Sequence, residues 1–528
     1  MNYRYLPVAS IRLLRFGAPA LLAGIFVLSS LNPALGQAEC TVEDEQRICV
    51  VAQGVGTLNL AIDGDTTDTG ERVDENTIYQ LESGGTYLLN GSIQNRFPLT
   101  IMAEPGAAER PRLIPAVQEG GGSSRAFRAR GDLYLDGVYV TNEDDLGGLN
   151  TRIIRVSADA VRITLENVHL DRDGQSAFRF DNADIRLFIN NSIVSNIGVT
   201  GDPNNGRVVD DRGNSIDSLV VTNSTFYNIT SRTLRDAGGP NNFVYFRHNT
   251  FVNHGQMVVT FGQTSSAHFV NNVIVNGGFY GATPTNPDYI LVSVDSVSEG
   301  DQTVVIANNV FYLDPAATDA QPDSVSVVPW FNATAENFIE ANGHGDLNFE
   351  EALAFTDGPD EPSGLITAFY ALDPDPPALD NGLTGDRTDP EVDVDPFDFS
   401  YSDATLAYTA STHGQPLGDL GYFELVPTAN EADPNVPQSF RLIGNYPNPF
   451  NPSTTVAFEL DDAAEVGLTI FDAMGREVMS IEPEMMAAGE SSILLRADNL
   501  ASGLYMYRLE ARTASETLTL QGRMTLLK

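Results

Sequence analysis

The sequence repeats Ser224-Thr-Phe-Tyr-Asn228 as Asn249-Thr-Phe-Val-Asn253 and again as Asn272-Val-Ile-Val-Asn276. The final asparagines of these copies are 25 and 23 residues apart. Related copies, with longer steps where residues are inserted, are Val138–Asn142, Asn167–Asp171, Ser192–Asn196 and Asn309–Leu313. A repeat of roughly 24 residues is typical of a solenoid built from stacked coils. Asparagine suits the turn of each coil, because it tolerates left-handed backbone and can hydrogen-bond to a stacked copy of itself.

Each coil has a second apolar strand upstream of this turn, and the two series advance along the chain with closely similar steps. The second series is Ala126–Arg130, Ile153–Ser157, Ala177–Asp181, Arg207–Asp211, Thr233–Ala237, Met257–Phe261 and Ile290–Val294. Two series of strands that advance together imply parallel strands stacked coil on coil. The leucine framework of a leucine-rich repeat is absent, since these strands are built mainly from Val, Ile and Phe.

This arrangement resembles the right-handed parallel β-helix of the pectate-lyase-like superfamily. The opening segment Tyr79–Leu89, followed by Leu99–Glu104 and Asp132–Gly137, is similar to the first coils of that superfamily. The resemblance implies an all-β protein whose main body is a right-handed parallel β-helix, a solenoid. It is specific for the fold and says little about a reaction.

Composition divides the chain into regions. We expect the parallel β-helix over residues 37–330, where strands alternate with Gly- and Asn-rich turns. Residues 331–437 are acidic, Pro-rich and irregular, and we expect them to complete or cap the helix. Residues 438–528 again contain short alternating strands, which predict a small Ig-like β-sandwich.

Three motifs mark the C-terminal region: Asn445-Tyr-Pro-Asn-Pro-Phe-Asn-Pro-Ser453, Ile470-Phe-Asp-Ala-Met-Gly-Arg476 and Leu500-Ala-Ser-Gly-Leu-Tyr505. They resemble the C-terminal sorting domain, type A, of type IX secretion. The resemblance implies transport across the outer membrane of a Gram-negative bacterium by the type IX machinery. It also implies removal of the domain, with the protein then secreted or held at the outer cell surface.

The N-terminus predicts export as well. Residues 1–36 contain arginines but no acid, then an apolar run, Phe16–Leu31, and small residues at Ala34 and Gly36. This order is typical of a signal peptide. A membrane anchor is less consistent with the run, which is short and interrupted by Pro19. No other stretch is long and apolar enough to cross a membrane.

Cys40 and Cys49 are the only cysteines. In an exported chain they are expected to form a small structural disulfide rather than a reactive pair.

The chain is strongly acidic. It has 71 Asp and Glu residues against 30 Lys and Arg, a net charge of −41, and Lys528 is its one lysine. Nucleic-acid binding is not expected, because phosphate recognition needs a basic surface. Several β-helix lyase families use a lysine base, which this helix lacks. An acidic surface also fits a high-salt habitat, so the charge alone does not require a ligand.

Arginine nevertheless recurs at one position of the upstream strands. Alternate residues of a strand face opposite sides, so these arginines are expected to face solvent in one row. The row is Arg128, Arg155, Arg179, Val209, Arg235, Val259 and Val292, flanked by Arg130 and Arg207. One interpretation is that each arginine pairs with a nearby aspartate. The other is a groove that binds the carboxylates of an acidic polysaccharide.

Asp181 and Asp211 are expected on neighbouring coils of the same face, with their carboxylates about 5 Å apart. Such a pair can bind Ca²⁺ or share acid and base roles. The alternative is salt bridges to Arg179, Arg207 and Arg235. The insertion Thr200-Gly-Asp-Pro-Asn-Asn-Gly-Arg207 is expected to overhang this site.

These patterns predict a secreted or surface-held β-helix that recognises, and in one interpretation cleaves, an anionic extracellular polysaccharide. The predicted substrate-binding residues are Arg128, Arg130, Arg155 and Arg207, and the predicted catalytic residues are Arg179, Asp181, Asp211 and Arg235. A polysaccharide lyase fits better than a glycoside hydrolase. The alternative is a non-catalytic adhesin or structural protein with the same fold.

Overall fold

The structure is a computed structural model. It describes residues 38–43, 46–67, 71–283, 289–297, 302–373, 377, 379, 385–412, 414–423, 440–446, 450, 452–460, 464–472, 476–486, 489–497, 500, 503–512 and 517–526. The predicted signal peptide, residues 1–36, lies outside the described residues.

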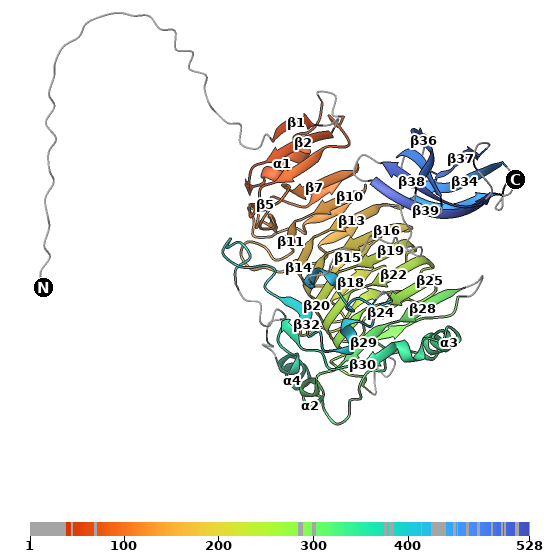
Figure 1. The fold of residues 1–528 in the computed structure, drawn as a ribbon. Coiled ribbons are helices and arrows are strands. Elements are labelled where there is room, and N and C mark those ends of the chain that lie inside the picture. Colours follow the sequence, from red (N-terminus) through yellow and green to blue (C-terminus); the bar gives the residue numbers. More distant parts are fainter. Residues whose placement is uncertain are drawn as a thin grey trace, which may run out of the picture. The chain divides into compact units, whose positions relative to one another are not determined.

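Three long sheets form the main body (Figure 1). The first is 11-stranded and parallel except for its first pair of strands. Its strands are β1 (Glu39–Glu43), β2 (Gln46–Val51), β4 (Ile78–Leu81), β7 (Leu99–Ala103), β10 (Leu133–Asp136), β13 (Arg162–Glu166), β16 (Ile185–Asn190), β19 (Ile216–Thr222), β22 (Asn241–Arg247), β25 (Thr264–Val270) and β28 (Thr303–Ala307).

The second sheet is also 11-stranded. It contains β3 (Gly54–Val55), β5 (Thr86–Leu89), β8 (Arg112–Pro115), β11 (Tyr139–Thr141), β14 (His169–Asp173), β17 (Ile193–Ile197), β20 (Thr225–Ile229), β23 (Thr250–His254), β26 (Val273–Gly277), β29 (Asn309–Tyr312) and β30 (Asn348–Glu350).

The third sheet is 8-stranded. It contains β6 (Ile93–Asn95), β9 (Phe127–Ala129), β12 (Ile154–Val156), β15 (Ser176–Phe180), β18 (Arg207–Asp210), β21 (Arg232–Arg235), β24 (Val259–Thr260) and β27 (Val292–Ser293).

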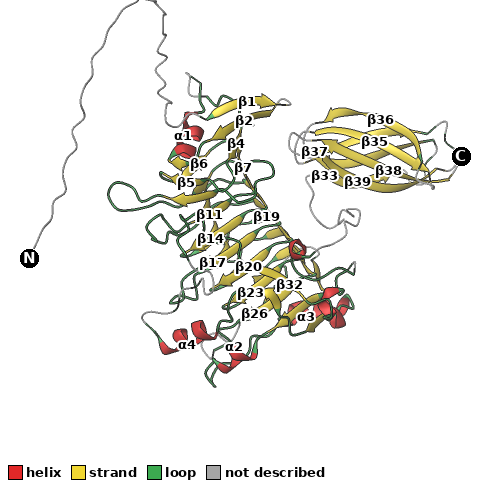
Figure 2. Cartoon of the chain, turned by 60° about the vertical axis from the view of Figure 1, so that its left-hand side comes forward, coloured by secondary structure: helices red, strands yellow, loops and turns green. Residues whose placement is uncertain are grey.

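Successive strands of the chain enter the three sheets in turn, so each full coil adds one parallel strand to each sheet (Figure 2). The predicted right-handed parallel β-helix is thereby confirmed. The two strand series of the sequence are the second and third sheets.

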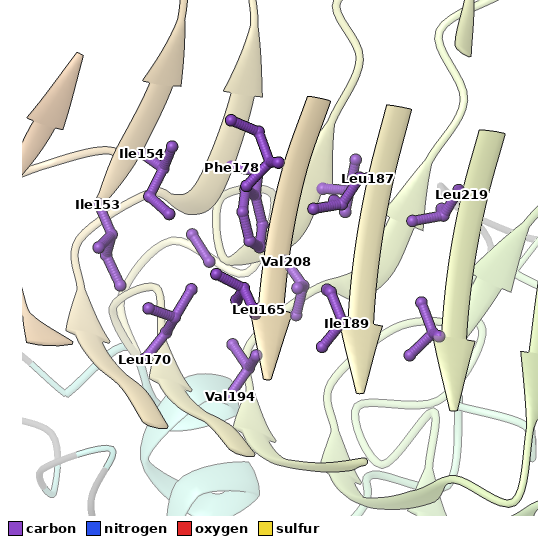
Figure 3. Close-up of a cluster of buried hydrophobic side chains, with 14 of the residues drawn as sticks. Ile153, Ile154, Leu165, Leu170, Phe178, Leu187, Ile189, Val194, Val208 and Leu219 are labelled. Carbon is purple, nitrogen blue, oxygen red and sulfur yellow. The ribbon is translucent and has the colours of Figure 1, made fainter. Parts of the chain in front are cut away.

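The core lies between the sheets, where side chains of equal coil position stack on one another. Ile154 pairs in register with Phe178, Leu165 with Ile189, and Leu170 with Val194. Figure 3 shows these side chains filling the space that the sheets enclose. Burying each such side chain contributes about 1.5–3 kcal/mol, so the stack of coils is the main source of stability.

Helices contribute to the core near both ends of the stack, where an open coil would expose it to water. At the N-terminal end, α1 (Thr57–Gly64) contributes Leu58 and Ile62 to the core. Near the other end, α3 (Ala333–Ala341) contributes Ala335 and Ile339.

One asparagine ladder runs along the turn between the second and third sheets. Asn196, Asn228, Asn253 and Asn276 all have left-handed backbone, with φ of 54–55°. Each side-chain amide of the last three donates to the Oδ1 of the asparagine one coil earlier, at 3.0 Å. The predicted hydrogen bonding between stacked asparagines is confirmed.

A further ladder runs inside the turn between the first and second sheets. The Nδ2 of Asn249 donates to Asn272 at 3.1 Å, Asn272 to Asn309 at 3.0 Å, and Asn309 to Asn348 at 2.8 Å. All four side chains are buried. Paired amides therefore satisfy polar groups that could not reach water.

The sequence alignment of one coil is wrong by a residue. Asp171 pairs with Ser195 rather than with Asn196, and Arg172 takes the left-handed turn position, with φ of 54°. Asp171 still supports the ladder, because its carboxylate accepts a hydrogen bond from Asn196 at 2.8 Å.

The segment that follows the coils covers the outer face of the second sheet. Phe399 and Leu417 pack against Tyr227, Val252 and Val275 of that sheet. Besides α3 and β30, the segment contains α2 (Pro315–Asp319), η1 (Gly345–Leu347), β31 (Phe355–Asp357), α4 (Ser363–Ala371), β32 (Asp398–Tyr401), η2 (Leu406–Tyr408) and η3 (Leu420–Tyr422). We call residues 385–423 the covering segment.

The C-terminal region is a β-sandwich with its own core, which includes Val456, Phe458, Leu468 and Leu509. One sheet contains β33 (Phe440–Tyr446), β34 (Ser453–Leu460) and β37 (Gly489–Arg496). The other contains β35 (Ala464–Asp472), β36 (Glu477–Met486), β38 (Gly503–Arg512) and β39 (Thr517–Leu526). All pairs within these two sheets are antiparallel.

The first two strands form a hairpin in which Cys40 lies directly opposite Cys49. Their sulfur atoms form a disulfide. The bond links the first strand to β2, whose other edge pairs with β4 and joins the first sheet.

The ladder between the second and third sheets predicts a large loss of stability for Asn228→Ala. The change leaves the buried Asn196 Oδ1 without this donor, at a cost of about 1–3 kcal/mol, and removes one of the two acceptors of the Asn253 Nδ2, which keeps the carbonyl of Asp360. Asn191→Ala is the matched control, because Asn191 also has positive φ but is exposed. In urea unfolding, the free energy of unfolding should fall by at least about 2 kcal/mol more for Asn228→Ala than for Asn191→Ala. Equal losses would mean that the ladder adds nothing beyond backbone conformation.

Candidate functional site

Arginines gather on the outer face of the third sheet and at the turn where its strands begin. We call this surface the arginine face. Its members are Arg125, Arg128, Arg152, Arg155, Arg179, Arg207, Arg232 and Arg235.

The predicted row lies in the middle of the strands. Its arginines pair in register on β9, β12 and β15, as Arg128, Arg155 and Arg179. The backbones of neighbouring members therefore lie about 4.8 Å apart, and their side chains stack in one row. Towards the N-terminus the row continues to Gln94. The Oε1 of Gln94 accepts a hydrogen bond from the exposed side chain of Arg130 at 3.0 Å.

The row does not contain Val209, as the sequence alignment placed it. Arg179 pairs with Asp210, which pairs in turn with Arg235. Val209 instead packs in the core beside Phe178 and Leu234. The insertion before β18 lengthens that coil. An alignment with the preceding coil therefore assigns the position opposite Arg179 to Val209 instead of Asp210, an error of one residue.

A second row of arginines lies at the start of the same strands and was missed by the sequence analysis. Arg207 and Arg232 pair directly. Arg125 and Arg152 occupy the equivalent positions, two residues before Phe127 and Ile154, which are in register. A signal was present, because Arg125-Ala-Phe-Arg128, Arg152-Ile-Ile-Arg155 and Arg232-Thr-Leu-Arg235 repeat one spacing.

Two aspartates neutralise part of this surface. Asp181 accepts hydrogen bonds from the Nε atoms of both Arg155 and Arg179, the latter at 2.9 Å. Burial alone would raise the pKa of Asp181, but the hydrogen bonds and charges of these arginines outweigh it and lower that pKa. Asp210 lies 2.8 Å from Arg235 and 3.7 Å from Arg207. For these four arginines, the interpretation as ion pairs with aspartate is correct.

The other four arginines lack such a partner. Among the described residues, no carboxylate lies within ion-pair distance of Arg125, Arg128, Arg152 or Arg232. Burial lowers the pKa of Arg125, and the charges of Arg155 and Arg152 lower it further. Burial also lowers the pKa of Arg232 to about 10, with Arg207 as the next cause. At a pKa of about 10 the guanidinium group of Arg232 is still charged at neutral pH, so the surface concentrates positive charge in an acidic chain.

Two of these four arginines also have an unused donor, and so does Arg207, whose Nε is buried without a partner among the described residues. The Nε atoms of Arg125 and Arg152 are buried and have no hydrogen-bond partner in the described part of the chain. Arg125 lines a polar hollow of about 170 Å³ together with Ser123, Ser124 and Asn150. A buried donor without a partner costs about 1–3 kcal/mol, so an anion that accepts from it would gain that energy.

Asp181 and Asp211 do not form the predicted carboxylate pair. Asp211 is buried, and its carboxylate accepts hydrogen bonds from the backbone N–H groups of Ala237 at 3.0 Å and Gly213 at 3.1 Å. Burial raises the pKa of Asp211. Asp210, one residue earlier, is the aspartate that faces the arginines.

These contacts also bear on the predicted calcium site and catalytic group. The oxygens of Asp181 face arginines and those of Asp211 face backbone donors, so this pair does not fit a shared Ca²⁺ ion. The described residues contain no group of three or more His, Cys, Asp or Glu side chains able to hold a metal. Arg179 contacts Asp181, whereas Arg235 contacts Asp210, so the four predicted catalytic residues do not meet at one point.

The insertion before β18 lies beside the arginine face, as predicted. Arg207 donates to the carbonyl of Asn204 in this loop, and Asn204 accepts from Gln256 at 3.1 Å. The loop packs closely, since a Cβ at Gly206 (φ 95°) would lie 1.8 Å from the Oγ1 of Thr230. A glycine is therefore required where the loop returns to the third sheet.

A Ser–His–Asp arrangement lies on the opposite side of the coil, between the second sheet and the covering segment. The Nε2 of His169 is 2.7 Å from the Oγ of Ser195, and its Nδ1 is 2.7 Å from Asp395. However, Ser195 is fully buried and donates its hydroxyl proton to Asp171 at 2.7 Å. Such a serine cannot reach a substrate.

The residues around this arrangement hold the covering segment in place. Arg387 donates to Asp171 at 3.1 Å, and Asp395 pairs with Arg110 as well as with His169. These contacts join the covering segment to coils that precede it by more than 200 residues. The sequence analysis missed them, because no local pattern connects residues so far apart.

Comparison with known proteins identifies the C-terminal region. Residues 445–520 match the family model described as Secretion system C-terminal sorting domain. This sandwich is a secretion-system sorting domain. The type IX sorting domain predicted from the sequence is therefore confirmed, and the chain that carries it is delivered out of the cell or to its surface. No helix of the described residues is long and apolar enough to cross a membrane.

The other two comparisons concern the chain as a whole. No curated protein matches the sequence. Among solved structures, a tailspike protein, gp49 from Acinetobacter baumannii bacteriophage Fri1, described as a capsular polysaccharide depolymerase, is 10% identical. The match covers 84% of this chain and 73% of that chain, with a TM-score of 0.13. A similarity at that TM-score carries no argument about fold or function.

The covering segment generates a prediction about pH. Asp419 is buried and accepts hydrogen bonds from Thr225 at 2.8 Å and from the N–H of Gly421 at 2.9 Å, and burial raises its pKa to about 7. The same carboxyl ionises near pH 4 in the unfolded chain. Between these pH values the folded state retains a proton that the unfolded state has lost, so stability falls as pH rises.

Asp419→Asn removes this ionisation. The variant should be more stable than the wild type by roughly 1–4 kcal/mol at about pH 8, with little difference at about pH 4. Urea unfolding at both pH values measures it, with the exposed Asp403→Asn as the control. A variant that keeps the pH dependence of the wild type would show that Asp419 is not the group responsible.

Proposed function

We propose that the arginine face binds an anionic extracellular polysaccharide that contains uronate residues. The observation that carries this proposal is the pair of buried, unpartnered Nε donors of Arg125, which lines a polar hollow, and of Arg152. Ion pairing with aspartate does not account for these arginines. A carboxylate can accept two parallel hydrogen bonds from one guanidinium group, which suits this geometry.

The arrangement of the arginines favours a polymer over a small anion. The two rows follow the stacking direction over several coils, so charges recur about every 4.8 Å along the face. A polymer with regularly spaced carboxylates would contact several arginines at once. The remainder of the chain is acidic, so an anion is attracted to this face and repelled elsewhere.

The sorting domain supports the same proposal, because delivery by type IX secretion would bring the β-helix to extracellular glycans. A Gram-negative bacterium would then display or release the protein at its outer surface. The polysaccharide and the secretion machinery are the partners that this proposal names.

Cleavage of the bound polymer is the second step of the proposal, and β-elimination suits the site better than hydrolysis. Guanidinium groups that neutralise a uronate carboxylate make the adjacent C–H more acidic. Elimination passes that C5 proton to a base, breaks the glycosidic C4–O bond, whose oxygen leaves with a proton taken from solvent, and forms a C4=C5 double bond. Hydrolysis usually needs two carboxyl groups beside the scissile bond. Asp181 and Asp210 are instead each bound by arginines. Binding without elimination would identify an adhesin, and the ultraviolet absorbance of the unsaturated product distinguishes the two.

Arginines without an aspartate partner give the sharpest test of binding. Arg128→Gln and Arg152→Gln should each weaken binding to alginate, polygalacturonate or chondroitin sulfate by about 1.5–3 kcal/mol, the range for a charged hydrogen bond. Neither change leaves an unpaired carboxylate. Added salt should reduce the affinity of the wild type, because exposed charges are screened. Isothermal titration calorimetry on the three polymers provides the measurement.

Two further variants make this test specific. Arg186→Gln, on the first sheet, removes the same charge elsewhere and should leave affinity nearly unchanged. Asp181→Asn should tighten binding, because it releases Arg155 and Arg179 for the ligand. The proposal fails if the arginine-face variants behave like Arg186→Gln, or if the wild type binds none of the polymers.

Delivery depends on the sorting domain in this account. A chain that ends at residue 437 should still fold its β-helix, because the sandwich has a separate core. It should remain in the periplasm, whereas the full chain should reach the outer surface. Protease digestion of intact cells, followed by immunoblotting, distinguishes the two locations. Surface exposure of the truncated chain would contradict the assignment of the address to this domain.

A further inference from the structure

A second hollow, of about 230 Å³, opens beyond the arginine face under the loop that precedes β18. We call it the aromatic pocket. Its walls come from this loop, from the segment after β26 and from α4. The lining residues on which the argument rests are Asp202, Asn204, Gln256, Tyr280, Tyr289 and Phe369.

Gln256 links this pocket to the arginine face. Its side chain is 1% exposed, and its Oε1 accepts hydrogen bonds from the guanidinium group of Arg232 at 3.1 Å and from Ser231 at 2.9 Å. Its Nε2 donates to the hydroxyl of Tyr289 at 2.8 Å and to Asn204 at 3.1 Å. The buried amide of Gln256 therefore fixes the position of Arg232 on the arginine face relative to Asn204 and Tyr289 in the pocket.

The apolar wall of the pocket is a cluster of aromatic rings. The rings of Tyr280 and Phe369 have centroids 4.6 Å apart, and those of Phe369 and Tyr370 are 5.0 Å apart. Tyr370 is held by a hydrogen bond of 2.6 Å from its hydroxyl to the carbonyl of Tyr280. The rings thus form a fixed surface rather than mobile side chains.

Tyr280 adds a polar group that is not satisfied by the protein. Its side chain is 2% exposed, and its hydroxyl is buried without a hydrogen-bond partner among the described residues. Since buried polar groups nearly always have a partner, a hydroxyl of this kind beside a pocket indicates a ligand or a bound water. On the loop, Asp202 already accepts hydrogen bonds from the backbone N–H of Asn204 and from the side chain of Asn205, and Asn204 accepts from Gln256, so their oxygens offer a ligand their remaining lone pairs.

We infer that the aromatic pocket binds a single sugar ring of the polysaccharide whose charged residues lie on the arginine face. A pyranose has an apolar face of C–H groups and a rim of hydroxyl groups. The aromatic cluster matches the face, while Asp202, Asn204 and the Tyr280 hydroxyl match the rim. Ligand sites of this kind are mostly apolar with a few placed polar groups.

This inference rests on the proposed function, because Arg232 connects the pocket to the same polymer. It adds a contact that does not depend on charge. The arginine face contributes salt-sensitive contacts along the chain, and the aromatic pocket contributes one salt-insensitive contact at a defined sugar. Recognition of one ring, rather than of charge density alone, would allow the protein to distinguish polymers of equal charge.

The experiment uses the full-length protein and the polymer of the panel (alginate, polygalacturonate or chondroitin sulfate) that the wild type binds. Phe369→Ala should weaken binding about 5- to 10-fold, and the factor should be the same at low and high salt, because this ring has no hydrogen bond to the Gln256 network that holds Arg232. The loss caused by Arg152→Gln should instead shrink as salt rises. Tyr134→Ala, a half-buried tyrosine on the first sheet, is the matched control and should have no effect.

A second variant and a second readout keep the test decisive. Phe369→Leu retains an apolar side chain and should weaken binding in the same salt-insensitive way, if circular dichroism shows that Phe369→Ala does not fold. Saturation-transfer NMR with irradiation of the aromatic protons should show transfer to sugar C–H protons in the wild type, and this transfer should be reduced in either variant. If the pocket variants bind the polymer as tightly as Tyr134→Ala does, while Arg152→Gln binds it more weakly, the proposed sugar site in the pocket is wrong and the proposed binding by the arginine face still holds. If Arg152→Gln binds like the wild type, the proposed function itself fails.

Discussion

Parallel coils that stack in register place residues of equal coil position directly above one another, about 4.8 Å apart. Every other feature of the β-helix depends on this constraint. Inside, it stacks Ile154 on Phe178 and so builds a continuous core. At the turns it brings asparagine amides within 3.0 Å of their copies, and the buried ladders in turn hold the register. Outside, it aligns arginines that are far apart in the sequence.

The same constraint carries an electrostatic cost. Stacked arginines repel one another, and the lowered pKa values of Arg125, Arg152 and Arg232 reflect burial together with that repulsion. Asp181 and Asp210 relieve it at two places. A chain with a net charge of −41 contains enough carboxylates to neutralise the whole surface, yet part of it is left without them. The proposed anionic ligand would account for this selective omission.

The fold is predictable from the sequence because the repeat is local and periodic. Alignment of the repeats places the turn asparagines correctly wherever the coils have similar lengths. It fails at insertions: the loop before β18 changes the phase, so Asp210 occupies the position assigned to Val209, and Asp211 turns to the backbone. Arg152 and Arg232 were missed, although their spacing from Arg155 and Arg235 repeats.

Contacts between distant segments lay beyond such reasoning. The hydrogen bond from Arg387 to Asp171 and the aromatic cluster of Tyr280 with Phe369 depend on how residues after the coils fold back. The repeat of the coils does not predict where the later segments pack against them. The sorting domain is the opposite case, since its motifs are short, local and characteristic, and the family match covers them.

The central claim is that the arginines without carboxylate partners bind the carboxylates of a polysaccharide. A crystal structure with a bound oligouronate tests it most directly. The account predicts sugar carboxylates within hydrogen-bond distance of the guanidinium groups of Arg125 and Arg152, with the saccharide chain running along the stacking direction of the third sheet. A saccharide bound on another face, with these guanidinium groups still unpartnered, would contradict it.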